Sequence, residues 1–289
     1  MDFKFNIDSW PWKIAVVVAL LAMREFVRLL SPKGKTGERS ETAKWGIETI
    51  DSAAIAIGLV LFIIQPFILQ AFFIPSGSME DTLRIGDRLL VSKMVYRLKE
   101  PAFQDVIVFK APPAALLNQN QTENIDFIKR CVGIPGDTVY MVDRQIYRNG
   151  KKVPEVYTKW SDPASSIGLT GSPDEGGLVS GAPRYSYDMK IVDQAVYSRE
   201  YIGPNEPGAW SRNGVIVPEA DQSKITNAPP GKVPAGNYLF LGDHRNNSND
   251  GHVWGFAPRS AVVGKAICVF WPPTRLGLVD RMSFYPRKP

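Results

Sequence analysis

The sequence predicts a mainly β domain that contains a loop-rich insertion and follows one or two membrane-spanning helices. Three observations support this fold class. An uncharged apolar run extends over residues 52–74, and Pro75 ends it. Short apolar stretches of strand length, separated by turn residues, occur on both sides of residues 153–234. Within that segment, residues 161–183 are dense in Gly, Ser and Pro and show little periodicity.

The composition is that of a folded chain of 289 residues, with room for one sizeable domain and membrane anchors. Apolar residues make up 44% and charged residues 22%, so disorder is not the default expectation. The net charge is +5, and no dense block of Lys and Arg is interleaved with aromatic residues. We therefore expect no nucleic acid partner, whereas a mildly basic surface suits anionic lipid headgroups.

The apolar run is long enough to cross a bilayer, which takes about 20 helical residues. We expect a transmembrane helix at residues 50–74, with a kink at Pro66. A shorter apolar run at residues 14–23 lies nearer the N-terminus. It predicts either a first transmembrane helix within residues 10–30 or a helix that lies at the membrane interface.

Basic residues gather between the two apolar runs, within the N-terminal segment 1–49. The positive-inside rule places this loop in the cytoplasm. The chain after Ile74 then lies on the opposite side of the membrane, whether one or two helices span it. The basic residues are Arg24, Arg28, Lys33, Lys35, Arg39 and Lys44.

The predicted β domain takes in residues 75–152 and 235–289, on the two sides of the insertion at 153–234. Asn149-Gly150 is a strong hairpin-turn signal, and it follows two short strand patterns. Helical patterns are scarce in this part of the chain. The strand patterns occupy residues 87–93, 105–110, 125–132, 138–142, 145–148, 236–241 and 261–271.

The two cysteines, Cys131 and Cys268, each lie in an apolar stretch. Free cysteines in such surroundings usually pack as small buried hydrophobic residues, which is the interpretation we favour. A disulfide between them stays open at this level, because two positions in a sequence do not determine a pairing.

Catalytic chemistry is suggested first by a serine and a lysine. Ser78 belongs to Ser-Gly-Ser-Met directly after the apolar run, and a serine hydroxyl needs a base to act as a nucleophile. The chain has no metal-binding pattern of His and Cys, so we expect no metal and no other cofactor. Lys129 lies in a strand pattern and shares a face with Phe127 and Cys131. Burial there would disfavour the ammonium form, so that Lys129 can serve as the base.

A polar loop at residues 242–256 stands between two strand patterns and contains both histidines, His244 and His252. Loops of this composition are most often solvated turns. The functional alternative is that the loop supplies the hydroxyls and charges that orient a base.

Together, these three clusters resemble the sequence boxes of bacterial type I signal peptidases, the membrane-bound Ser–Lys proteases that remove signal peptides from exported preproteins. The serine box resembles residues 74–83, the lysine box residues 128–137, and the last box residues 242–256. They occur in the family's order and after a membrane anchor, whereas the insertion at 153–234 matches in position alone. The resemblance implies a serine endopeptidase with the signal-peptidase/LexA-like β fold, and no cofactor.

The resemblance also assigns roles to residues. Ser78 would be the nucleophile, and Lys129 would be the general base and later the acid. Ser76 would contribute its hydroxyl, with the Ser78 backbone N–H, to an oxyanion hole. Ser248 would hydrogen-bond and orient the Lys129 amine, and Asp250 would support the same loop. A shallow pocket for small side chains before the scissile bond would include Ile74 and Met79.

Three residues depart from the family pattern. Asp81 stands where the family usually has Pro, and His244 stands where it tends to have Asn or a similar residue. His252 replaces a usual Arg that pairs with the acid at Asp250. A histidine partner would make that pairing dependent on pH.

The implied substrates are preproteins with signal peptides, and the implied partners are the phospholipid bilayer and nearby export machinery. The implied location is the bacterial inner membrane, with the catalytic domain on the extracytoplasmic side. Alternatives are a related protease with a specialised substrate or with a Ser–His dyad through His252, and a membrane scaffold without activity. A self-cleaving regulator would need a DNA-binding module, where this chain has membrane segments. Aromatic residues expected to touch the outer leaflet are Phe72, Phe73, Trp254 and Trp271.

Overall fold

The protein divides into two compact units, residues 1–70 and residues 71–289. The first unit holds the helices of the predicted membrane segments, and the second holds the β domain. Most of the predicted Gly-, Ser- and Pro-rich stretch lies outside the described residues. The structure, a computed structural model, describes residues 10–31, 40–117, 125–161, 186–201 and 207–282.

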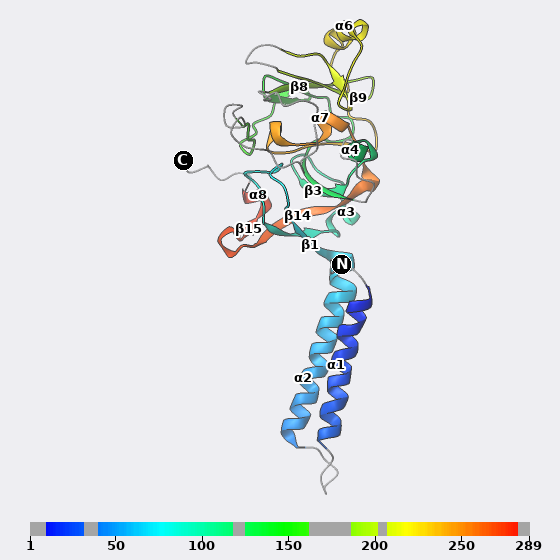
Figure 1. The fold of residues 1–289 in the computed structure, drawn as a ribbon, viewed down its shortest axis with the longest axis vertical. Helices are drawn as coiled ribbons and strands as arrows, with labels where there is room; N and C mark the ends of the chain where they lie inside the picture. Colours follow the sequence, from blue (N-terminus) through cyan, green and yellow to red (C-terminus); the bar gives the residue numbers. More distant parts are fainter. Residues whose placement is uncertain (1–9, 32–39, 118–124, 162–185, 202–206, 283–289) are drawn as a thin grey trace, which may run out of the picture. The chain divides into compact units, whose positions relative to one another are not determined.

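In the first unit, helices α1 (Trp10–Leu30) and α2 (Glu41–Leu59) lie side by side (Figure 1). Among the described helices, only the stretch Glu41–Ile64 is long and apolar enough to cross a membrane. Helix α1 covers the predicted first segment, but charged side chains interrupt its apolar sequence. These residues are Lys13, Arg24, Glu25 and Arg28.

The expected helix at residues 50–74 needs correction at both ends. Helix α2 begins at Glu41, because the Ser40 hydroxyl caps it by accepting a hydrogen bond from the Ala43 N–H at 3.3 Å. A π-helix, η1 (Val60–Ile68), continues α2. The chain then becomes strand β1 (Leu69–Phe73), whose backbone pairs within a sheet instead of continuing the helix.

In the second unit, an eight-stranded sheet carries most of the predicted strands, each within about two residues of its expected bounds. Strands β3 and β4 run antiparallel in a register that places Lys129 opposite Ile107. Strand β15 (Gly277–Leu278) pairs with β14 outside the main order. That order is β1, β2 (Arg88–Ser92), β14 (Val262–Trp271), β3 (Val106–Lys110), β4 (Asp126–Gly133), β12 (Asn237–Leu241) and β13 (Ala257–Pro258).

A second sheet has seven strands, and they come from both sides of residue 153, the predicted start of the insertion. Three of its strands precede that point and four follow it, so the inserted segment extends a sheet that the preceding chain begins. The hairpin turn at Asn149-Gly150 is present, with φ angles of +51° and +77°. The order is β11 (Val215–Ile216), β10 (Ser211–Arg212), β9 (Ala195–Glu200), β8 (Tyr187–Val192), β5 (Val139–Val142), β6 (Gln145–Arg148) and β7 (Lys151–Lys152).

Helices in the described part of the second unit are short, and all but α8, which follows the last strand, lie between strands. Helix α6, in the insertion, has nine residues, and the other α-helices have four or five. The α-helices are α3 (Val95–Leu98), α4 (Pro113–Leu117), α6 (Glu219–Asn227), α7 (Gly251–Trp254) and α8 (Val279–Met282). The 3₁₀ helices are η2 (Arg245–Asn247), η3 (Arg259–Ala261) and η4 (Pro273–Arg275).

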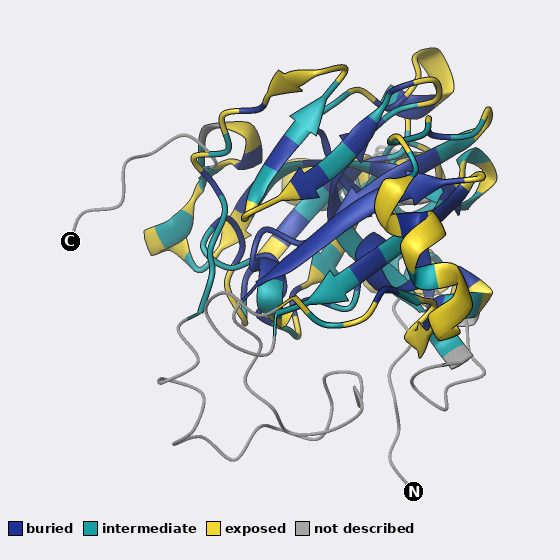
Figure 2. Cartoon of the chain, turned by 90° about the horizontal axis from the view of Figure 1, so that it is seen from above, coloured by how far each residue is buried: buried dark blue, intermediate teal, exposed yellow. Residues whose placement is uncertain are grey.

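The core of the second unit lies on both faces of the eight-stranded sheet. In β3, Val106 and Val108 belong to one buried cluster, and Ile107 and Phe109 belong to another. Because alternate strand residues point to opposite faces, this strand is buried on both sides. Figure 2 shows the buried residues concentrated on the central strands and the exposed ones along the outer strands and turns.

Both cysteines are free thiols. Cys131 is buried on β4, and Cys268 is half-buried on β14. Strand β3 lies between these two strands, which places them about 10 Å apart, too far for a disulfide. Cys131 therefore packs as a small buried hydrophobic residue, as the sequence predicts.

Candidate active site

Ser78 is positioned by a tight turn between β1 and β2. The Glu80 N–H donates to the Gly77 carbonyl at 3.0 Å, and the Leu83 N–H donates to the Met79 carbonyl at 2.8 Å. The Ser78 side chain is nearly enclosed, with 7% of the residue exposed. Local backbone bonds thus hold the turn that carries Ser78, and its side chain is largely shielded from solvent.

Lys129 approaches Ser78 from the middle of β4. Its Nζ donates a hydrogen bond to the Ser78 Oγ at 2.5 Å, although the two residues are 51 positions apart. Lys129 is 5% exposed, and its Nζ lies 5.7 Å from the centre of the Phe127 ring, as the strand pattern predicts. Burial removes the amine from water, and the neutral amine is the form that would accept a proton from a serine.

Ser76 also lies close to the nucleophile candidate. Its Oγ is 3.4 Å from the Ser78 Oγ, and the residue is half-buried. A hydroxyl at this place can donate a hydrogen bond to an oxygen of a group that reacts with Ser78. The oxyanion-hole role itself stays a prediction.

Ser248 comes close to the Ser78 backbone but does not bond to Lys129. A Cβ added to Gly242 would lie 2.3 Å from the Ser248 Oγ and 2.5 Å from the Ser78 carbonyl oxygen, so only glycine fits between them. The Ser248 Oγ is buried and has no hydrogen-bond partner within the described part of the chain. The expected hydrogen bond to the Lys129 amine is therefore not formed in this structure.

Asp250 forms a buried pair with His252, its carboxylate oxygen lying 2.7 Å from the His252 Nδ1. The other oxygen accepts the Gly242 N–H at 2.7 Å. Burial alone would raise the pKa of Asp250, but the charge and hydrogen bond of His252 and the Gly242 N–H outweigh it and hold that pKa below its ordinary value. The His252 ring stacks on Tyr187 at 4.0 Å. Asp250 thus ties the two ends of the polar loop together.

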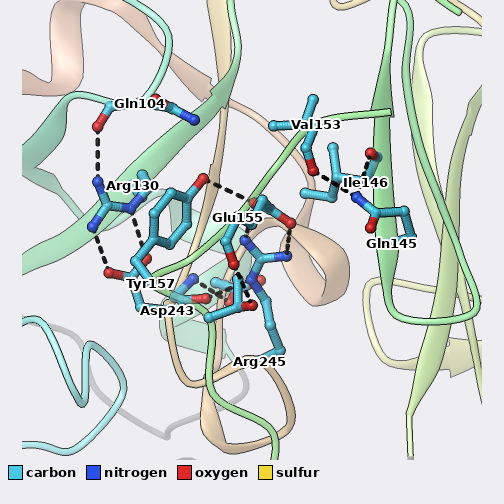
Figure 3. A network of polar contacts seen from close by, with 12 residues as sticks. Gln104, Arg130, Gln145, Ile146, Val153, Glu155, Tyr157, Asp243 and Arg245 are labelled. Carbon is cyan, nitrogen blue, oxygen red and sulfur yellow. Dashed lines mark hydrogen bonds and ion pairs between the residues drawn. The ribbon is translucent and has the colours of Figure 1, made fainter. Parts of the chain in front are cut away.

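A network of buried charges joins β4, the polar loop and the start of the insertion (Figure 3). Arg130, next to Lys129, forms an ion pair with Asp243 at 2.6 Å, and both side chains are at most 2% exposed. The Tyr157 ring lies 3.8 Å from the Arg130 guanidinium, and its hydroxyl donates to Glu155 at 2.9 Å. Glu155 in turn binds Arg245 at 2.5 Å. The sequence analysis did not predict this network. The signal available in the sequence was a charged residue within an apolar strand pattern, as at Arg130.

Comparisons with known proteins show the family of the chain. The family described as signal peptidase, peptidase S26, matches residues 46–271. The chain belongs to this family. The members of this signal peptidase family are serine endopeptidases and are associated with membranes.

Relatives of the family cover most of the chain. The probable signal peptidase I-2 of Synechocystis sp. is 32% identical over 88% of this chain and 84% of its own length. The signal peptidase I of Leptolyngbya laminosa is 33% identical over 80% of this chain and 81% of its own. The signal peptidase I of Aquifex aeolicus is 34% identical over 74% of this chain and 80% of its own. The match therefore extends over both the helical and the β units.

One of the departures from the signal peptidase pattern, His244, lies beside the Ser78 turn, to which a second departure, Asp81, belongs. The His244 Nε2 shares a hydrogen bond with the Ser161 hydroxyl, and its Nδ1 lies 3.6 Å from the Glu80 carboxylate. Burial and the nearby Lys159 ammonium lower the pKa of His244, and Glu80 opposes them in part. The His244 ring thus bonds to Ser161 and the His252 ring to Asp250. Among the described residues, the Ser78 hydroxyl bonds to Lys129 and Ser76.

The two predicted pocket residues of the signal peptidase site, Ile74 and Met79, are buried. Ile74 is 3% exposed and Met79 is 0% exposed, and both belong to one hydrophobic cluster with Leu83 and Leu89. Their contact with a substrate stays a prediction, and it requires this cluster to open where they lie.

Across the described residues, no group of three or more His, Cys, Asp and Glu side chains could hold a metal ion.

Proposed function

We propose that this signal peptidase cleaves preproteins with Ser78 as nucleophile and Lys129 as general base. One observation carries the assignment: in a member of a serine endopeptidase family, the Lys129 Nζ lies 2.5 Å from the Ser78 Oγ inside a nearly dry site. The pair has the reach and the environment that proton transfer from serine to a neutral amine needs.

In the first step, Lys129 takes the proton of the Ser78 hydroxyl while the Ser78 Oγ bonds to the carbonyl carbon of the scissile peptide. The oxyanion that forms accepts hydrogen bonds from the Ser76 hydroxyl and the Ser78 N–H. When the tetrahedral species collapses, the C–N bond breaks and the leaving amine takes the proton from Lys129. An oxyanion-hole donor of this kind is worth about 10²–10³ in rate.

In the second step, water hydrolyses the acyl-enzyme at Ser78. Lys129 removes a proton from that water and returns it to the Ser78 Oγ as the ester bond breaks. Ser248 lies beside the Ser78 carbonyl, and Asp250 holds the loop that contains Ser248. We assign both to the support of this site, and the reaction needs no cofactor.

The helix Glu41–Ile64 anchors the enzyme in the bacterial inner membrane. The basic residues between the two helical segments lie in the cytoplasm according to the positive-inside rule, which puts the catalytic domain on the extracytoplasmic side. Residues 75–152 and 235–289 form that domain around the insertion. Protein-export machinery, which delivers preproteins to the same membrane, is a neighbour in this arrangement.

Two exposed aromatic residues of the eight-stranded sheet are suited to contact the outer leaflet. Phe73 on β1 is 57% exposed, and Trp271 on β14 is 51% exposed. Exposed aromatic residues of this size suit the membrane interface. The two other aromatic candidates differ, since Phe72 packs against the core and Trp254 is buried in it.

The test is cleavage of a model preprotein with an Ala-x-Ala site, in detergent, by the wild type and by Lys129→Ala and His252→Ala. Loss of cleavage with Lys129→Ala, with cleavage retained in His252→Ala, supports the Ser–Lys assignment. Cleavage that survives in Lys129→Ala but not in His252→Ala would make histidine the base. A wild type that leaves this preprotein uncut points to a specialised substrate or to a scaffold.

A further inference from the structure

A short segment at the start of the insertion runs along the polar loop that faces the active site. We call residues 155–161 the strap. The Lys159 N–H donates to the Asp243 carbonyl at 2.8 Å, and the Arg245 N–H donates to the Lys159 carbonyl at 2.9 Å. These two bonds form a parallel β-bridge between Lys159 and His244. The backbone of Lys159 is therefore held next to the loop.

Both ends of the strap are also anchored to that loop. Glu155 binds Arg245 through two hydrogen bonds of 2.5 and 3.0 Å, and neither side chain is more than 5% exposed. At the other end, the Ser161 N–H donates to the Asn246 side chain at 2.9 Å, and the Asn246 amide donates to the Ser161 carbonyl at 2.8 Å. The strap can therefore serve as a firm support for the Lys159 side chain.

The Lys159 side chain reaches from the strap to the turn that carries Ser78. Its Nζ lies 3.1 Å from a Glu80 carboxylate oxygen and 3.9 Å from an Asp81 carboxylate oxygen. The same Glu80 oxygen would lie 3.6 Å from a Cβ added to Gly77, so Glu80 folds back against the residue before Ser78. One ammonium group thus faces two neighbouring carboxylates just after the nucleophile.

The turn is held to the loop and strap by at least three hydrogen bonds, one of which the buried Thr82 hydroxyl donates to the Asp243 carboxylate at 2.5 Å. The His244 N–H donates to the Ser78 carbonyl at 3.1 Å, and Lys159 binds Glu80 two residues further on. We propose that Lys159 is a positioning residue for the hydrolysis at Ser78: through Glu80 it sets the placement of the Ser78 hydroxyl relative to Lys129. This proposal rests on the proposed function of these two residues.

The physical reason is charge balance on the turn. Without the Lys159 ammonium, the carboxylates of Glu80 and Asp81 repel each other and the turn loses its attachment through Glu80, while the bonds of Ser78 and Thr82 to the loop remain. A displacement of about 1 Å in a reacting group can cost about 10²-fold in rate. Because Lys159, Glu80 and Asp81 are each about one-third exposed, solvent reduces the effect, and we expect a loss of about five- to tenfold.

The experiment uses the full chain in detergent, with steady-state cleavage of the Ala-x-Ala preprotein. Lys159→Met keeps the length of the side chain and removes its charge. Lys224→Met is the matched control, since Lys224 pairs with Asp193 at 3.9 Å far from Ser78 in the sequence, and both side chains are at least 70% exposed. We expect kcat to fall about five- to tenfold in Lys159→Met, with KM within about twofold and a melting temperature close to that of the control.

A second variant separates positioning from folding. Adding Glu80→Gln to Lys159→Met removes the repulsion between Glu80 and Asp81, so kcat should recover by at least about threefold. An unchanged kcat in Lys159→Met would overturn the proposal. A loss confined to KM, or a loss that follows a drop in melting temperature and does not recover in the double variant, would overturn it too.

Ser78→Ala, measured in parallel, separates this proposal from the proposed function. Cleavage retained in Ser78→Ala would refute the nucleophile, and the positioning role with it. An inactive Ser78→Ala beside a fully active Lys159→Met would refute the positioning role alone.

Discussion

The ion pair between Arg130 and Asp243 allows a quantitative prediction of stability. The two groups are 2.6 Å apart, and their side chains are 2% and 0% exposed. Arg130→Met removes the cation and leaves the Asp243 carboxylate buried with the Thr82 hydroxyl as a remaining donor, at 2.5 Å. Breaking a buried pair from one side typically costs about 3–5 kcal/mol. For a unit of this size, that corresponds to a fall in melting temperature of about 6–20 °C.

The assay is thermal unfolding of the detergent-solubilised chain, followed by circular dichroism and compared with Lys224→Met. Lys224 and its partner Asp193 are 70% and 78% exposed, so that control should change stability by less than about 0.5 kcal/mol. The double variant Arg130→Met, Asp243→Leu should be more stable than Arg130→Met, because it removes the unpaired buried charge. If Arg130→Met melts no earlier than the Lys224→Met control, the reasoning from burial is wrong.

The remaining predictions concern the polar loop. His252→Arg should keep or raise preprotein cleavage, since a guanidinium can pair with Asp250 and stack on Tyr187; complete loss would restore the histidine-base alternative. The folded state lowers the pKa of Asp250, so its stabilising contribution is complete above about pH 4 and is lost as the pH falls through the folded value. Asp250→Asn should therefore flatten the decline of melting temperature between about pH 4 and pH 2; an unchanged slope would contradict this. The pKa of His244 is also lowered, so the unfolded chain binds the proton first and stability falls as the pH drops below about 6.5. His244→Asn should remove that component, as melting curves from pH 7 to pH 5 would show.

Local patterns in the sequence were sufficient for the strands and for the position of the reactive lysine. The runs at residues 105–110 and 125–132 became β3 and β4, and Lys129 lies against Phe127 as alternation along a strand requires. The apolar run at residues 52–74 was less informative at its C-terminal end. A stretch of apolar residues suits a membrane helix and a buried strand alike, and the pairing of β1 within a sheet decided its last residues.

The meeting of Ser78 with Lys129 was expected from family resemblance, and the supporting contacts around them were not. The bond expected from Ser248 to Lys129 is absent: the Ser248 hydroxyl lies buried beside Gly242 without a hydrogen-bond partner among the described residues. The strap was unexpected because its residues lie in a segment that matched the family in position alone.

The sequence by itself determined the membrane run and the strand-rich character of the domain, and it indicated which serine and lysine are the candidates for the chemistry. These properties depend on residues close together in the chain, through hydrophobic periodicity and the chemistry of single side chains. The tertiary structure alone decided which charges meet. Arg130 and Asp243 are 113 positions apart, and Lys159 and Glu80 are 79 apart. Such pairs depend on which strands and loops become neighbours, and a period of two or of 3.6 residues contains no information about that.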